Sequence, residues 1–95
     1  MARAILKNAV IAESDDIQVI EGNTYFPPDS IKREFFKPSE THSICPWKGI
    51  ASYLDVVIDG DTIKDGAWYY PEPKQKAAHF KDFVAFWRGV VIEES

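Results

Sequence analysis

The chain has 95 residues, 45% of them hydrophobic and 27% charged, and its net charge is −4. This length supports one modest hydrophobic core, so we expect a single domain over residues 1–95. The scattered Lys and Arg residues disfavour nucleic-acid binding, which needs a basic stripe, and the single cysteine excludes an internal disulfide and a four-cysteine zinc site.

The N-terminal region predicts short strands joined by tight turns. Lys7-Asn8, Asp15-Asp16 and Glu21-Gly22-Asn23 supply the turns. The strands that we expect between and around them are residues 4–6, 9–12, 17–20 and 24–26. Strands this closely spaced indicate an antiparallel meander.

Prolines interrupt the strand pattern in the next region. Pro27-Pro28 ends the first run of strands, because neither proline can donate to a ladder. We expect one short helical turn over residues 31–33, with Asp29 or Ser30 as its cap. A strand follows, and Pro38 is expected to cut it off.

The clearest strand covers residues 50–58, whose side chains alternate between two faces. Asp59-Gly60 predicts a hairpin after it, because a type I′ turn needs positive φ at both central positions. The return strand covers residues 62–70. The stretch THSICPWKGIASY, residues 41–53, which runs into the clear strand, is predicted to be a loop that packs Trp47 and Tyr53 and displays Lys48 beside a concave surface.

The C-terminal region admits two interpretations. Four apolar residues at helical spacing fit one helix over residues 74–87. Arg88-Gly89 before an apolar run instead favours a short helix near 74–79 and two closing strands that form a hairpin, and we prefer this second interpretation. About eight short strands with one or two short helical segments predict a mainly β fold, an antiparallel meander that forms a barrel-like or folded sheet.

Several segments together resemble a known family. They are Tyr25-Phe26-Pro27, Cys45-Pro46-Trp47-Lys48-Gly49, Ala51-Ser52-Tyr53, Ala67-Trp68-Tyr69-Tyr70-Pro71 and Phe83-Val84-Ala85-Phe86. Over nearly its whole length the chain is similar to domain of unknown function 427, and the Cys-Pro-aromatic-Lys-Gly element is the most specific part of the likeness. The resemblance implies a compact, mainly β single domain with a small helical insertion.

The same family has been labelled nucleotidyltransferase-like, which directs attention to Asp59-Gly60-Asp61. Paired aspartates bind magnesium in nucleotidyl transfer, but that chemistry also needs a Gly-Ser turn shortly upstream and a third carboxylate nearby. The Gly-Ser element is absent here, and a hairpin already explains Asp-Gly between two strands. Nucleotidyl transfer stays the weaker of two enzyme hypotheses.

The other enzyme hypothesis uses Cys45 and His42. Lys48 lies close enough in sequence to lower the pKa of a thiol, and His42 could act as its base. As metal ligands the two residues form only half a zinc site, which His79 and a carboxylate would have to complete, so we expect no metal and no cofactor. The alternative for Cys45 is a small buried hydrophobe.

The interpretation that we favour is a small-molecule or anion-binding module with its pocket near the Cys-Pro-Trp-Lys-Gly loop. Gly49 permits a turn that displays Lys48 at the mouth of a cavity, and aromatic side chains with polar tips could line it. Arg33 could reach an anionic ligand. The predicted ligand-binding residues are Lys48, Tyr53, Trp68, Arg33, Trp47 and Tyr25.

The sequence also gives expectations for the cellular location and the assembly of the protein. No apolar run approaches the ~20 residues needed to cross a bilayer, and no apolar signal core follows the first residues. We therefore expect a cytoplasmic protein without membrane contact. An interaction protein, for example a homodimer that uses exposed aromatics or an edge strand, stays an alternative, and the sequence leaves open whether the protein is an enzyme.

Overall fold

The computed structural model describes residues 1–94, most of which lie in short β-strands. The strands are β1 (Ala2–Leu6), β2 (Ala9–Ser14), β3 (Gln18–Ile20), β4 (Asn23–Tyr25), β5 (Phe36–Cys45), β6 (Gly49–Ile58), β7 (Asp61–Tyr69), β8 (Ala85–Phe86) and β9 (Val91–Glu94). The helical segments in this range are the 3-10 turns η1 (Pro28–Ser30), η2 (Arg33–Phe35) and η3 (Gln75–Phe80). The predicted mainly β fold with short helical segments is therefore confirmed.

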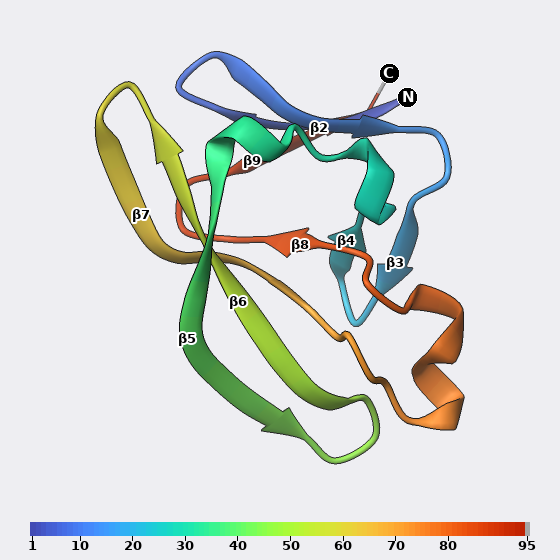
Figure 1. Ribbon diagram of the computed structural model, residues 1–95. Coiled ribbons are helices and arrows are strands. Elements are labelled where there is room, and N and C mark those ends of the chain that lie inside the picture. Colours follow the sequence, from blue (N-terminus) through green and yellow to red (C-terminus); the bar gives the residue numbers. More distant parts are fainter. Residues whose placement is uncertain (95) are drawn as a thin grey trace.

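The strands form three antiparallel sheets, β2-β1-β9, β3-β4 and β5-β6-β7-β8 (Figure 1). The strands β5, β6 and β7 form a long twisted ribbon, and β1, β2 and β9 lie across the top of the view. The third sheet is a meander, as expected, because its strands follow one another in chain order. Within the described residues none of the sheets closes on itself, so the predicted barrel is wrong.

The hairpin turns follow from local backbone preference. Lys7 and Asn8 have φ of 49° and 65° between β1 and β2, and Asp59 and Gly60 have φ of 51° and 80° between β6 and β7. Positive φ at both central residues is the type I′ pattern, whose twist matches that of the flanking strands. Both predicted hairpins are confirmed by the pairing of their strands.

The predicted N-terminal meander is wrong, because β2 and β3 belong to different sheets. The edge of β2 that β3 would have occupied is taken by Ile31, which bridges Ala12, and the Lys32 amide donates to the Ile11 carbonyl at 2.8 Å. The first four strands are therefore two separate hairpins. Residues 31–32, which follow these four strands in the sequence, cover the free edge of β2.

The helical turn predicted at residues 31–33 is displaced. Ile31 is extended, with φ of −85° and ψ of 144°, and the turns lie before and after it in η1 and η2. Pro28 occupies the first position of η1, where its fixed φ suits a helical start. Neither turn has a side-chain cap, so the predicted capping by Asp29 or Ser30 is also wrong; the Ser30 hydroxyl donates to the Pro27 carbonyl instead.

The strand that Pro38 was expected to end continues to Cys45 as β5. β5 is an edge strand, where a proline can turn its missing donor away from the ladder, and its register with β6 shifts between Pro38 and His42. The loop predicted over residues 41–53 is thus mostly hairpin. Only residues 46–48 form the turn between β5 and β6.

The C-terminal region contains a short helical segment, η3, and two strands, as preferred over one long helix. The closing hairpin is wrong, because β8 pairs with β7 and β9 pairs with β1. Arg88 and Gly89, with φ of 55° and 97°, redirect the chain between them. This segment therefore ties the third sheet to the first. No helix among the described residues is long and apolar enough to cross a membrane.

Buried side chains form two clusters. The first core lies where the first sheet meets β6, β7 and β8, and it includes Leu6, Ile11, Phe26 and Val56. The second core lies against η3, and its members are Tyr25, Ala51, Tyr70, Ala77, Phe80 and Ala85. Because successive residues of a strand face opposite sides, neighbouring residues at the end of β4 enter different cores. The two cores therefore meet at the end of β4, where Tyr25 enters the second core and Phe26 the first.

Candidate functional site

Lys48 occupies the turn between β5 and β6 and is the one charged residue classed as buried among residues 1–94, with 6% of its surface exposed. Its ammonium group donates a hydrogen bond to the Glu21 carboxylate at the β3–β4 turn. Gly49 makes the turn possible, as predicted: its φ is 116°, and a Cβ there would lie 3.3 Å from the Glu72 carbonyl oxygen. Lys48 is thus held inside the molecule.

Aromatic rings surround the ammonium group of Lys48. Its Nζ lies 5.3 Å from the Trp47 ring centroid and 5.7 Å from that of Tyr70, within the range of cation–π attraction. Trp68 Nε1 donates to the Tyr25 hydroxyl at 3.1 Å, and these two rings meet edge to face. We call Lys48, Glu21 and these four aromatic residues the Lys48 cluster.

Electrostatics keep the ion pair of the Lys48 cluster charged. Burial alone would lower the pKa of Lys48, but the hydrogen bond to Glu21 and the nearby tyrosines raise it above its ordinary 10.5. The hydrogen bonds from Lys48 and then Trp47 lower the pKa of Glu21 below 4.5. Burial raises the pKa of Tyr70 to about 12. At neutral pH the cluster therefore holds one ammonium, one carboxylate and neutral phenols.

Most of the predicted ligand-binding residues lie in or beside the Lys48 cluster. Tyr53 packs at the edge of the second core, and its hydroxyl lies 2.8 Å from the Ser43 hydroxyl. Tyr25 has none of its surface exposed. Arg33 is elsewhere, on η2. Of the predicted aromatic residues, Trp47 lies at the ammonium group of Lys48, and a ligand-binding role for the cluster stays a prediction.

Cys45 and His42 point to opposite faces of the sheet. Residues 42–45 pair with β6 without interruption, so side chains three positions apart lie on different sides. Cys45 packs against the second core, whereas the His42 imidazole is exposed, with Nδ1 3.4 Å from the Ser52 hydroxyl. One metal ion could not bind both, and His42 could not act as base for the thiol. Among residues 1–94 no group of three His, Cys, Asp or Glu side chains could hold a metal ion.

The aspartates of Asp59-Gly60-Asp61 serve the β6–β7 hairpin. Asp59 and Gly60 form its turn, and the Asp61 carboxylate forms an ion pair with Lys7 of the β1–β2 turn. The two hairpin ends are thereby joined at the surface. Nothing in this geometry presents two free carboxylates to a metal ion.

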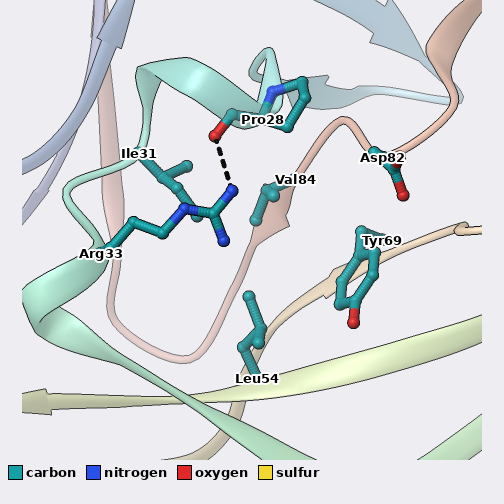
Figure 2. A pocket seen from close by; sticks show the side chains of 7 residues that line it. All are labelled: Pro28, Ile31, Arg33, Leu54, Tyr69, Asp82 and Val84. Atoms are coloured by element: carbon teal, nitrogen blue, oxygen red, sulfur yellow. Dashed lines mark hydrogen bonds between the residues drawn. The ribbon is translucent and has the colours of Figure 1, made fainter.

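A cavity of about 280 Å³ lies between the η1–η2 region and the β6–β7 strands, on the side of the first core (Figure 2). We call it the Arg33 pocket, and it is lined by Pro28, Ile31, Arg33, Leu54, Tyr69, Asp82 and Val84. Its walls are fixed by backbone contacts from distant segments. Val84 and Phe26 exchange hydrogen bonds of 2.8 Å, and Ile31 is held by its bridge to Ala12.

The charged groups in the Arg33 pocket have no partner of opposite charge among the described residues. Arg33 Nη2 donates to the Pro28 carbonyl at 3.4 Å, and no carboxylate of the described residues pairs with the guanidinium. The Asp82 carboxylate and the Tyr69 hydroxyl make no hydrogen bond or ion pair within residues 1–94. Sequence reasoning missed Tyr69 and Asp82. The alternation in β7 could have indicated Tyr69, since Trp68 and Tyr70 face the second core and the residue between them must face the other side.

A second cavity, of about 360 Å³, lies beside the Cys-Pro-Trp-Lys-Gly loop where a pocket was expected. It is lined by His42, Gly49, Ile50, Ser52, Pro71, Glu72 and Lys74. Lys48 is not among these residues. The cation at this cavity is Lys74, whose Nζ donates to the Pro46 carbonyl at 2.6 Å.

Comparison with known proteins gives a family and no activity. No curated protein matches the chain. The family model described as a domain of unknown function (DUF427), which also bears a nucleotidyltransferase label, matches residues 1–94. The match covers both candidate regions, the Lys48 cluster and the Arg33 pocket. The chain therefore belongs to the DUF427 family.

Proposed function

We propose that the protein binds a small organic anion in the Arg33 pocket. The observation that carries the proposal is a guanidinium group without a carboxylate partner, set at the edge of a cavity with apolar walls. Ligand sites in proteins combine largely apolar linings with a few placed polar groups. The pocket combines apolar side chains of Ile31, Leu54 and Val84 with the polar groups of Arg33, Tyr69 and Asp82.

The geometry of Arg33 suits an anionic ligand. Its contact with the Pro28 carbonyl uses one of five N–H donors and orients the planar group, so that the others can bind a carboxylate or phosphate through two parallel hydrogen bonds. In Figure 2 the guanidinium group is directed toward the side chains of Ile31 and Val84. The volume of about 280 Å³ is near the lower end for ligand pockets and favours a small molecule.

Lys48, the cation that the sequence favoured, does not contact the ligand in this proposal. Its charge is already matched by Glu21, and an external anion would have to displace that carboxylate.

Cys45, the single cysteine, carries a free thiol, as is usual in a reducing compartment, and we include a cytoplasmic location in the proposal on that ground.

The test is an NMR titration of the ¹⁵N-labelled protein with hexanoate, benzoate and inorganic phosphate. We expect at least one of these anions to shift the amide signals of Leu54, Tyr69 and Val84, and Arg33→Gln to abolish the shifts. Lys32→Gln is the matched control, because Lys32 is an exposed neighbouring cation that does not line the pocket. Shifts that persist in Arg33→Gln, or no shifts with any of the three anions, would contradict the proposal.

A further inference from the structure

We infer that the ligand of the Arg33 pocket is dipolar, with an anionic group at Arg33, an ammonium group at Asp82 and an apolar chain between them. This inference rests on the proposed function and names the ligand class. Its basis is the presence of two opposite charges at one cavity, neither of which is neutralised by the protein.

The backbone holds Asp82 firmly at the pocket. Its amide donates to the Tyr70 carbonyl at 3.1 Å, and the following amides of Phe83 and Val84 donate to Phe80 and Phe26 carbonyls. Its φ is 63°, in the left-handed region that aspartate tolerates better than most residues. The half-buried carboxylate is therefore presented from a fixed position, although it forms no contact that would explain its place.

Arg33 and Asp82 do not neutralise each other. No ion pair joins them, and Figure 2 shows them on opposite sides of the pocket with Val84 and Leu54 between them. A ligand with only a carboxylate would be repelled by Asp82 and would leave that charge partly desolvated and unpaired. A ligand with only an ammonium group would do the same to Arg33. Because unpaired charges in a binding site are costly, a molecule that carries both charges is favoured.

The arrangement of the walls indicates where the two charges of the ligand lie. Leu54 and Val84 separate the charged residues, so an apolar segment of the ligand fits between its charged ends. The ring of Tyr69 lies on the side of Asp82, and its unpartnered hydroxyl can donate or accept one further hydrogen bond. A linear ω-amino acid matches this order better than an α-amino acid, whose charges are on adjacent groups.

The test compares 6-aminohexanoate with hexanoate and hexylamine, which have the same chain and one charge fewer, and with leucine, its isomer with adjacent charges. Affinities are measured by isothermal titration calorimetry, with NMR shifts to locate binding. For wild-type protein we expect 6-aminohexanoate to bind about tenfold more tightly than any of the other three, a difference of about 1.4 kcal/mol.

Two variants test which end of the ligand binds Arg33 and which end binds Asp82. Asp82→Asn keeps the shape and the tolerance of positive φ, and we expect it to bind hexanoate as tightly as 6-aminohexanoate. Arg33→Gln is expected to bind neither hexanoate nor 6-aminohexanoate. Asp59→Asn is the matched control, since Asp59 also has positive φ but lies in the β6–β7 turn away from the pocket, and it should behave as wild type.

The outcomes separate the two proposals. If hexanoate binds wild-type protein as tightly as 6-aminohexanoate and Arg33→Gln loses it, anion binding stands and the dipolar ligand is refuted. If leucine binds most tightly, the separated charges are refuted. If none of the four compounds binds and the three anions of the first titration also fail, both proposals fall.

Discussion

The Lys48 cluster and the Arg33 pocket use similar residues in opposite ways. Each contains a cation, a carboxylate and at least one tyrosine ring. In the Lys48 cluster the cation is buried and hydrogen-bonded to Glu21, whereas in the Arg33 pocket the cation is exposed and Asp82 remains apart from it. A charge that the protein neutralises internally contributes to the fold, while one that it leaves open is available to a ligand. The two regions therefore respond differently to substitution.

The largest effect on stability is expected from Lys48→Ala. The substitution leaves a cavity among Trp47 and Tyr70 and removes the partner of Glu21, so we expect it to lower the free energy of unfolding by about 2–4 kcal/mol. Urea denaturation at neutral pH measures the difference.

Lys48→Met is the control for packing, because it keeps most of the side-chain volume and removes only the charge. We expect its loss to be about 1 kcal/mol, since Met fills most of the space of Lys48 and the Glu21 carboxylate, whose side chain is 53% exposed, can be solvated by water instead. If Lys48→Ala is as stable as wild type, Lys48 does not hold the fold, and the contrast between the two regions fails.

A smaller effect is expected from Tyr70→Phe, and only at alkaline pH. The folded pKa of Tyr70, about 12, lies above the ordinary value of 10, so neutral Tyr70 stabilises the fold below pH 10 and this contribution is lost as pH rises toward 12. Between pH 8 and pH 11 the free energy of unfolding of wild type should therefore fall by about 1 kcal/mol more than that of Tyr70→Phe. At pH 8 the two should be similar, because the Tyr70 hydroxyl has no hydrogen-bond partner within residues 1–94. Urea midpoints of both proteins at pH 8 and pH 11 test this. The same difference in midpoint at the two pH values would contradict it.

The effect of Glu21→Gln is expected to depend on acid pH. The folded pKa of Glu21 lies below 4.5, so its charged form stabilises the fold above that value, and the contribution is lost as pH falls through the folded pKa. The thermal midpoint of wild type should exceed that of Glu21→Gln at pH 7, and the gap should narrow as pH falls through the folded pKa of Glu21. Glu40→Gln, an exposed change on β5, is the control and should keep a constant offset. A constant offset for Glu21→Gln would show that its charge plays no part.

The elements that could be predicted from sequence are those fixed by neighbouring residues. Lys7-Asn8 and Asp59-Gly60 determine their hairpins through positive φ, a property of two residues alone. The errors concern contacts between distant segments. Ile31 takes the edge of β2, and β9 pairs with β1 rather than with β8, and in each case several strands could have occupied the same edge. Hydrophobic alternation does not distinguish between them.

The candidate site shows the same division between local and distant information. The turn at Gly49 and the position of Trp47 beside Lys48 could be predicted, because they depend on the hairpin itself. Tyr70, which follows β7, was not predicted to contact Lys48. Glu21 could not be identified as the partner of Lys48 across 27 positions in sequence. Asp82 was missed for the same reason, since only the packing of separate chain segments brings it to the same pocket as Arg33.

The smallest effects on stability are expected in the Arg33 pocket. Neither Arg33 nor Asp82 has an ionic partner in the described part of the chain, so Arg33→Gln and Asp82→Asn should each change the free energy of unfolding by less than about 0.5 kcal/mol. Urea denaturation beside Lys48→Ala gives a direct comparison. A loss for Arg33→Gln as large as that for Lys48→Ala would mean that the pocket cation also supports the fold. Near-zero changes, with ligand binding abolished, would separate the cation that stabilises the protein from the one that serves its ligand.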